Sequence, residues 1–212
     1  MMKDLYQIAD ELRAVANSGI HFSENGYDQE RYRQVLKASA RLIAALEQRQ
    51  VEEVLAEYTG NLGHLSPLLG VEAVVIRQGK ALLIRRRDDG RWAAPGGLAE
   101  VGESLAQAAV RELWEEAGVR GRAVKLLGVY DSRFWPTKTR MQLCIAQFLV
   151  ESDDLPGVRL AAEEGLSAHT ETLDAAFFDE QHLPELHVGH EQRLAMAFKL
   201  LRGEIEAPYF DR

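Results

Sequence analysis

Three glutamates near the middle of the chain, Glu112, Glu115 and Glu116, have the spacing of neighbours on one side of a helix. Like charges side by side weaken a helix unless positive charge lies among them. A divalent cation would supply that charge, because Mg²⁺ binds carboxylate oxygens and keeps water molecules for a phosphate-bearing substrate. The spacing therefore predicts a metal site for phosphate chemistry, although the helix alone is equally compatible with a glutamate-rich solvated face.

The residues around these glutamates form a longer pattern. Five residues separate Gly97 from Glu103, and seven more separate Glu103 from the pair Arg111-Glu112. An aliphatic residue, any residue, the pair Glu115-Glu116, any residue, a glycine and an aliphatic residue complete it. This stretch of 23 residues, with every fixed position present, resembles the Nudix box. The protein therefore resembles the Nudix hydrolases.

The resemblance implies a set of metal ligands. Glu112, Glu115 and Glu116 would hold Mg²⁺ or Mn²⁺ together with the backbone carbonyl of Gly96. Glu112 and Glu116 are the principal ligands in this assignment. Because it gives Glu116 no contact with the core, Glu116→Gln is expected to lose most turnover and to leave the fold intact.

Other residues of the box would support these ligands. Arg111 would orient the glutamates, and Glu103 would be the salt-bridge partner of Arg111. The resemblance also gives both glycines a backbone role: Gly97 would form a tight turn before the helix, and Gly118 would end it.

The family hydrolyses a nucleoside diphosphate linked to another group: divalent ions neutralise the pyrophosphate, and an activated water attacks phosphorus. A general base must take the proton of that water. In many family members this base is a glutamate in a loop beyond the box, so the candidates are Glu163, Glu164 and Glu171, with Glu171 preferred. All three could equally be solvated loop acids, and Glu115 is the rival base inside the box.

Four residues are candidates for substrate binding. Trp92 could stack on a base, although packing is the more common role of such a tryptophan. Arg133 and Trp135 lie in a segment that offers stacking and phosphate contacts, or forms a solvated loop with a small apolar cluster. Arg85 could hold a phosphate, but a solvated strand edge is the commoner reading. The array typical of Nudix enzymes acting on NADH is absent.

Two histidines, His187 and His190, have the spacing of a metal-binding pair. No third ligand stands near them in the sequence. We therefore expect roles at a helix start or on the surface.

The surrounding sequence predicts the elements that position these residues. Residues 1–66 contain only helical patterns, with a first helix broken at Gly19, and form a small all-helical N-terminal domain. Residues 67–212 form the Nudix domain, of class α+β: an α/β/α sandwich with a mixed sheet. Two β-rich runs meet at a Gln78-Gly79 turn before the box. The glutamate helix is expected to begin with a Ser104/Gln107 capping box and to turn Ala106, Val110, Leu113 and Ala117 to the core.

Composition excludes several classes of protein. The net charge of −8 argues against a broad phosphate-tracking surface, so nucleic-acid binding is not expected. The single cysteine, Cys144, rules out an internal disulfide. Because no apolar run is long enough for a membrane helix and the N-terminal sequence lacks the apolar part of a secretory signal, we expect no membrane partner and a cytoplasmic location.

The helical segment, the linker and the box together resemble a bacterial Nudix subgroup that includes CDP-choline and ADP-ribose pyrophosphatases. The resemblance implies a metal-dependent pyrophosphohydrolase that releases a nucleoside monophosphate and a phosphorylated product, and a homodimer to which the helical segment contributes. The alternatives are a house-cleaning hydrolase of nucleoside triphosphates and a non-catalytic nucleotide sensor. The complete set of box carboxylates opposes the sensor.

Overall fold

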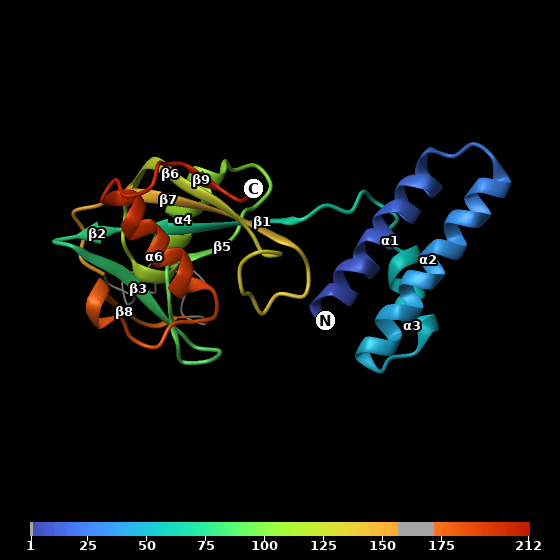
Figure 1. Cartoon of the computed structure of the whole chain (residues 1–212), viewed down its shortest axis with the longest axis horizontal. Helices are drawn as coiled ribbons and strands as arrows, with labels where there is room; N and C mark the ends of the chain where they lie inside the picture. The colour runs from blue at the N-terminus through green and yellow to red at the C-terminus, as the bar shows by residue number, and fades with distance from the viewer. Residues whose placement is uncertain (1, 157–171) are drawn as a thin grey trace. The chain divides into compact units, whose positions relative to one another are not determined.

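The computed structural model describes residues 2–156 and 172–212, which divide into two compact units (Figure 1). One unit contains the residues up to Pro67 together with Thr139–Gln142. The other contains Leu68–Lys138 and Leu143–Arg212. The segment from 139 to 142, which the sequence assigns to the Nudix domain, is thus grouped with the helical unit.

Three helices make up the first unit: α1 (Met2–Phe22), α2 (Gly26–Glu47) and α3 (Val51–Thr59). Their apolar faces share one core, which includes Ala9, Ala16, Leu36, Ile43 and Val54. A buried hydrogen bond from the Ser39 hydroxyl to the Ala9 carbonyl oxygen (2.7 Å) ties α2 to α1. Three amphipathic helices are thereby packed into a single unit.

The prediction that Gly19 breaks the first helix is wrong, because α1 continues to Phe22. A Cβ at Gly19 would lie 2.3 Å from the ring of Tyr32, so the glycine allows α2 to pack closely against α1. The chain reverses after Phe22, and Asn25 begins α2 by accepting a hydrogen bond from the Tyr27 backbone nitrogen.

The second unit contains two sheets. The larger has the order β5-β1-β7-β6-β9, with β1 (Leu68–Val74), β5 (Gly96–Leu98), β6 (Arg122–Asp131), β7 (Leu143–Glu151) and β9 (Tyr209–Phe210). It is mixed: β1 runs parallel to β7 and β6 parallel to β9, whereas β1 and β5, and β6 and β7, are antiparallel. The strand β1 therefore pairs directly with the glycines that precede the box helix.

The smaller sheet is antiparallel. Its strands are β2 (Ile76–Arg77), β3 (Lys80–Arg86), β4 (Trp92–Ala93) and β8 (Thr172–Asp179). The predicted turn between β2 and β3 is confirmed, because Gln78 and Gly79 both adopt the positive φ that a tight hairpin needs.

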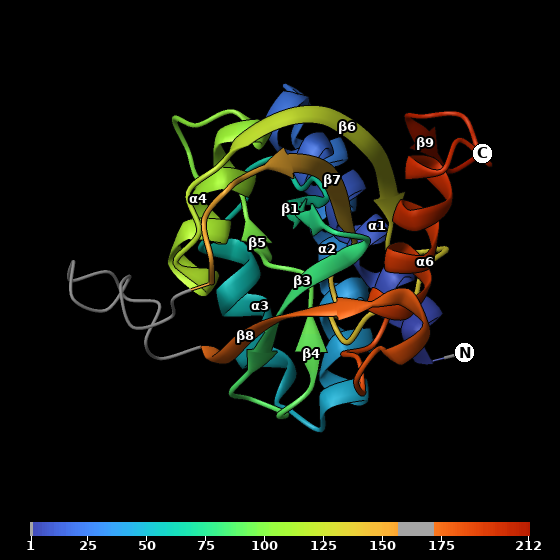
Figure 2. The same cartoon turned by 90° about the vertical axis from the view of Figure 1, so that its left-hand side faces the viewer.

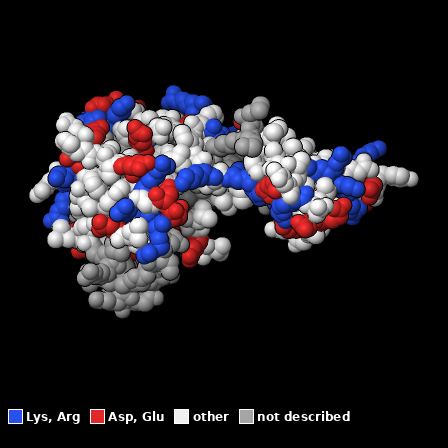
Figure 3. All heavy atoms as spheres, turned by 90° about the horizontal axis from the view of Figure 1, so that it is seen from below, with Lys and Arg blue, Asp and Glu red and all other residues white. Residues whose placement is uncertain are grey.

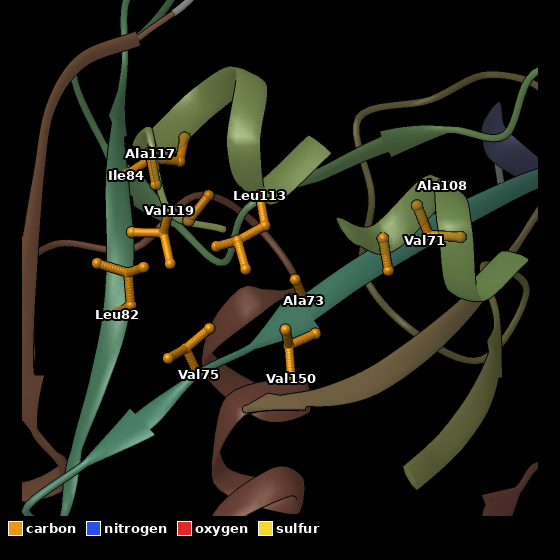
Figure 4. Close-up of a cluster of buried hydrophobic side chains, with 12 residues drawn as sticks. Val71, Ala73, Val75, Leu82, Ile84, Ala108, Leu113, Ala117, Val119 and Val150 are labelled. Carbon is orange, nitrogen blue, oxygen red and sulfur yellow. The ribbon is translucent and has the colours of Figure 1, made fainter. Parts of the chain in front are cut away.

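Two helices cover the strands on opposite sides: α4 (Leu105–Ala117) on one and α6 (His190–Leu201) on the other (Figure 2). In the core under α4, Val71 and Ala73 of β1 and Leu82 of β3 meet Leu113 and other α4 residues (Figure 4). On the other side, Ala197 and Leu200 of α6 pack on Val74 and Leu127. The α/β/α sandwich and the helical N-terminal domain are thus confirmed.

One detail of the helix prediction needs correction. The buried face of α4 contains Ala108 and Ala109 besides Leu113 and Ala117, whereas Ala106 is only half-buried. Val110 is partly buried and packs on the same core. The helix is therefore rotated slightly from the predicted orientation, and this rotation also buries Glu116.

Acidic and basic side chains are interspersed on the face of each unit shown in Figure 3. None of the helices in the described ranges is both long enough and apolar enough to cross a membrane.

Candidate metal and phosphate site

The helix α4 begins and ends at residues that fix its position. The Ser104 side chain accepts a hydrogen bond from the Gln107 backbone nitrogen, and the Gln107 side chain accepts one from the Ser104 nitrogen, so the predicted capping box is present. At the other end, Gly118 has φ 64°, a left-handed conformation that suits glycine. Both ends of the glutamate helix are thus determined locally.

Two glutamates of α4 reach the dipeptide Gly96-Gly97 in β5. Glu116 Oε2 accepts a hydrogen bond from the Gly96 nitrogen at 2.8 Å, and Glu116 is only 6% exposed. The Glu112 carboxylate lies against Gly97, since a Cβ there would be 2.5 Å from Glu112 Oε1. Gly97 lies in a strand and has no positive φ, so the predicted tight turn is wrong. It is the closeness of Glu112 that requires a glycine.

Arg111 lies among the carboxylates of the box. Its Nε and Nη2 donate to the two oxygens of Glu103 at 3.1 and 2.8 Å, and its Nη1 donates to Glu112 Oε1 at 2.9 Å and Glu115 Oε2 at 3.1 Å. Nη2 also donates to the Leu98 carbonyl oxygen. The bond to Glu103 and the neighbouring carboxylates hold the pKa of Arg111 above its ordinary value, and the pKa of Glu103 is lowered in turn. Arg111 thus fixes three glutamates relative to strand β5.

The donor atoms here suit a hard divalent cation, because carboxylate and carbonyl oxygens are the ligands that Mg²⁺ and Mn²⁺ prefer. In residues 2–156 and 172–212, however, no three His, Cys, Asp or Glu side chains converge closely enough to hold a metal ion. The reason is visible in the contacts: Glu112 and Glu115 turn to Arg111, and Glu116 turns to the Gly96 nitrogen. The metal-ligand assignment stays a prediction.

The candidate bases fall into two groups. Glu115 lies on α4, with its side chain 25% exposed beside Arg111. Glu163, Glu164 and Glu171 lie outside the described residues.

Two of the substrate candidates are tryptophans that make packing contacts. Trp92 in β4 contacts Phe178 edge to face, with the ring centroids 4.7 Å apart. Trp135 donates from Nε1 to Asp211 Oδ1 (2.6 Å) and contacts the rings of Tyr130 and Tyr209. Trp135 therefore joins the 132–138 loop to the C-terminal segment.

The two candidate arginines make local polar contacts. Arg133 pairs with Asp131 at 2.7 Å. The Nε of Arg85 donates to the Gly90 carbonyl oxygen at 3.0 Å, across the loop between β3 and β4. None of these contacts joins either arginine to a glutamate of α4.

The structure adds a buried polar cluster that the sequence analysis missed. Glu72 of β1 is 4% exposed; Arg193 of α6 donates to its Oε1 from Nε and Nη2 (2.9 and 2.5 Å), and Gln147 of β7 donates to its Oε2. Burial opposes ionisation of Glu72, but the Arg193 charge and these bonds lower its pKa to about 2. A charged residue inside the apolar run "VEAVV" was the available signal.

The two histidines do not form a metal pair. His187 Nδ1 lies 2.8 Å from Asp89 Oδ2, whereas His190, the first residue of α6, accepts a hydrogen bond from the Ala94 nitrogen at Nδ1 (3.2 Å). Burial lowers the pKa of His190 to about 4, so its ring is neutral near pH 7. The expected helix-start role holds for His190, which in addition contacts the segment between β4 and β5 that leads to Gly96.

Comparison with known proteins agrees with this architecture. Residues 67–197 match the model of the Nudix domain, and residues 3–57 match that of a UDP-X-like N-terminal oligomerisation domain. Bacillus subtilis YjhB, named as a candidate ADP-ribose pyrophosphatase, is 31% identical over 209 residues, which cover 96% of this chain and 95% of YjhB. An ADP-ribose pyrophosphatase of Methanocaldococcus jannaschii is 34% identical over 133 residues, covering 61% of this chain and 72% of its own.

Solved structures support the same assignment. A UDP-X diphosphatase has a TM-score of 0.57 at 22% identity and covers 99% of both chains, which shows a shared fold. An ADP-ribose pyrophosphatase from Streptococcus suis has a TM-score of 0.54 at 26% identity, covering 69% of this chain and all of its own. The chain belongs to the Nudix hydrolase family, as a pyrophosphatase with a UDP-X-like N-terminal oligomerisation domain.

Proposed function

We propose that this enzyme is a divalent-metal-dependent pyrophosphohydrolase of nucleoside diphosphate derivatives, with ADP-ribose as the first candidate substrate. The observation that carries the proposal is the approach of Glu112 and Glu116 to Gly96-Gly97, with Arg111 bound to Glu112 and Glu115 beside them. The names of the relatives from Bacillus subtilis and Methanocaldococcus jannaschii favour ADP-ribose. CDP-choline and UDP-linked compounds are the next candidates, the latter because of the similar UDP-X diphosphatase fold.

In this proposal Glu112, Glu115, Glu116 and the Gly96 carbonyl would hold Mg²⁺ or Mn²⁺. The cation, when bound, neutralises the pyrophosphate and lowers the pKa of a water molecule. Arg111 keeps the carboxylates in position through Glu103 and the Leu98 carbonyl oxygen. Glu115 or Glu171 takes the proton of the attacking water. The water oxygen forms a bond to one phosphorus of the pyrophosphate, and the bond from that phosphorus to the bridging oxygen breaks, so the bridging oxygen leaves with the second phosphorus.

The residues that would bind the rest of the substrate are less specific. Arg133 and Arg85 would contact phosphate, and Trp92 and Trp135 would stack on a base, in addition to the contacts they make now. Alanine variants of these four residues should therefore change KM among substrates more than kcat.

The test is hydrolysis of a panel of ADP-ribose, CDP-choline, UDP-glucose, NADH and nucleoside triphosphates, with Mg²⁺, Mn²⁺ or EDTA. A nucleoside monophosphate and a phosphorylated second product, formed from one preferred diphosphate derivative and lost in EDTA, would support the proposal. Release of pyrophosphate from triphosphates would establish the house-cleaning alternative instead. Turnover that persists in EDTA would rule out the metal assignment.

A second proposal concerns assembly: we infer a homodimer formed through α1. Ile8, Val15 and Phe22 are 44%, 57% and 78% exposed and lie seven residues apart, so they share one side of the helix. Half-buried Leu5 and Leu12 continue this apolar stripe. The match of residues 3–57 to an oligomerisation domain favours a second copy of α1 as the occupant.

Sedimentation velocity of Val15→Glu tests the interface. The variant should sediment as a monomer, since a buried carboxylate would lie at the centre of the stripe. Val101→Glu is the control, because Val101 is fully exposed and lies outside the helical unit. A Val15→Glu dimer, or a monomeric unsubstituted protein, would contradict this interface.

A further inference from the structure

The segment that leads into the box, residues 94–96, is held from three elements. Each contributes one hydrogen bond: Ala94 N donates to His190 Nδ1 of α6 (3.2 Å), Ala73 N of β1 donates to the Pro95 carbonyl oxygen (2.8 Å), and Gly96 N donates to Glu116 Oε2 of α4 (2.8 Å). Two of these partners, Glu116 and His190, act through their side chains. Glu116 belongs to the box, whereas His190 lies outside it, on the far side of the sheet from α4.

We propose that His190 is a positioning residue for the metal and phosphate site. By accepting from the Ala94 nitrogen, its ring fixes the segment that carries the Gly96 carbonyl and the Gly96-Gly97 contact surface for Glu112 and Glu116. His190 itself touches none of these carboxylates of α4 in the hydrogen bonds described above. Its effect on the site would be transmitted through two residues of backbone.

The surroundings of His190 suit this role. Its side chain is 11% exposed, and Nδ1 lies 3.2 Å from the Ala94 nitrogen and 3.5 Å from Glu72 Oε1. A neutral ring that accepts from the Ala94 N–H at Nδ1 carries its proton on Nε2. Ala94 is buried, so its N–H would lack a ready replacement if the ring were removed. A rigid, neutral acceptor at this position therefore restricts where the segment can lie.

The helix that carries His190 is anchored to the same pair of strands. Arg193 lies three residues further along α6 and binds the buried carboxylate of Glu72. Glu72 is the residue of β1 directly opposite Gly96 in β5. One side of α6 thus holds both strands at the point where they meet the box, through Arg193 on β1 and His190 on the residues just before β5.

The proposal rests on the metal-dependent function inferred above, so its test measures cation binding apart from turnover. Mn²⁺ affinity of the full chain would be followed by the electron paramagnetic resonance signal of free Mn²⁺. His190→Leu removes the acceptor and should weaken Mn²⁺ binding about 10- to 100-fold, as loss of outer supports of metal ligands commonly does. His190→Asn keeps an acceptor near the position of Nδ1 and should recover much of the affinity.

Two controls separate positioning from general loss of stability. Ser39→Ala removes one buried hydrogen bond in the helical unit and should leave Mn²⁺ affinity at the wild-type value. His182→Leu removes a histidine whose side chain is 79% exposed and should also have no effect. Circular dichroism would show that each variant is folded before its affinity is compared.

The outcomes are distinct. Weak binding by His190→Leu together with recovery in His190→Asn supports the role. If folded His190→Leu binds Mn²⁺ as tightly as wild type, or if the Ser39→Ala control loses the same affinity, the positioning role is refuted and the proposed function stands. If the unsubstituted enzyme binds no Mn²⁺, the proposed function fails, and the inference fails with it. Should His190→Leu not fold, His190→Gln decides: its acceptor lies near Nε2, so wild-type affinity in that variant refutes the role.

Discussion

Adjacent glycines, Gly96 and Gly97, should respond to the same substitution in opposite ways. Neither has a positive φ, so alanine is compatible with the backbone of both. A Cβ at Gly97 would meet the end of the Glu112 side chain at 2.5 Å, which can turn away. A Cβ at Gly96 would meet the Val71 carbonyl oxygen at 2.2 Å, which belongs to the paired strand and cannot. Gly97→Ala should thus impair function, and Gly96→Ala should impair folding.

The size of the effect follows from the contact. To restore an ordinary separation, the Glu112 carboxylate must retreat by about 1 Å from β5. A misplacement of about 1 Å at a reacting centre can lower the rate on the order of 100-fold, which corresponds to about 2.7 kcal/mol of transition-state stabilisation. The free energy of unfolding of Gly97→Ala should change by less than about 1 kcal/mol, because a long side chain absorbs the contact.

The assay compares kcat/KM for the preferred substrate with urea unfolding of both variants. Gly97→Ala should unfold near the wild-type midpoint and lose activity, while Gly96→Ala should unfold at a clearly lower urea concentration. Gly26→Ala is the control for glycine replacement, since nothing lies within 4 Å of a Cβ there. Wild-type kcat/KM in Gly97→Ala would refute the reasoning that the position of Glu112 against β5 is needed for catalysis.

Three further predictions concern charged groups. Arg111→Lys keeps the charge but has three N–H donors, too few for the five hydrogen bonds that Arg111 makes, so kcat should fall about 10- to 100-fold, with little change in circular dichroism; wild-type kcat would contradict the orienting role. Glu115 and the preferred loop candidate Glu171 are tested by replacing each with glutamine: the variant at the true base should lose the acidic limb of the kcat profile against pH, and a profile retained in both variants would exclude both. Because the His190 pKa falls from 6.5 to about 4 on folding, the unfolded chain binds more protons between these pH values, and stability should drop as pH falls from 6.5 towards 4. Urea unfolding at pH 7 and 4.5 should show that wild type loses ~2 kcal/mol more than His190→Asn, and equal losses would contradict the buried neutral ring.

The sequence was sufficient for the parts of the fold that have local causes. The capping box at Ser104, the Gln78-Gly79 turn and the C-terminal end of α4 at Gly118 depend on residues within a few positions of one another. The long box pattern identified α4 and the family for the same reason. Local pattern could not show that Gly19 is required by Tyr32 of another helix.

Contacts between distant segments account for the rest. Glu72, Gln147 and Arg193 come from β1, β7 and α6, so their approach depends on the pairing of β1 with β7 and on the packing of α6. The contact of Trp135 could not be predicted from local sequence either, because its partner Asp211 is 76 residues away. The expectation that Glu116 makes no contact with the core was wrong, since Glu116 is buried and bonded to the Gly96 nitrogen.

That buried bond of Glu116 has a consequence for how such an enzyme can lose its activity during evolution. A substitution at Glu116 would disturb the junction of α4 with β5 as well as a proposed ligand, so it should lower the amount of folded protein along with turnover. Glu115, whose side chain is more exposed and has no described bond to β5, can change with less structural harm. A lineage that kept the fold for binding alone would therefore be expected to lose Glu115 before Glu116.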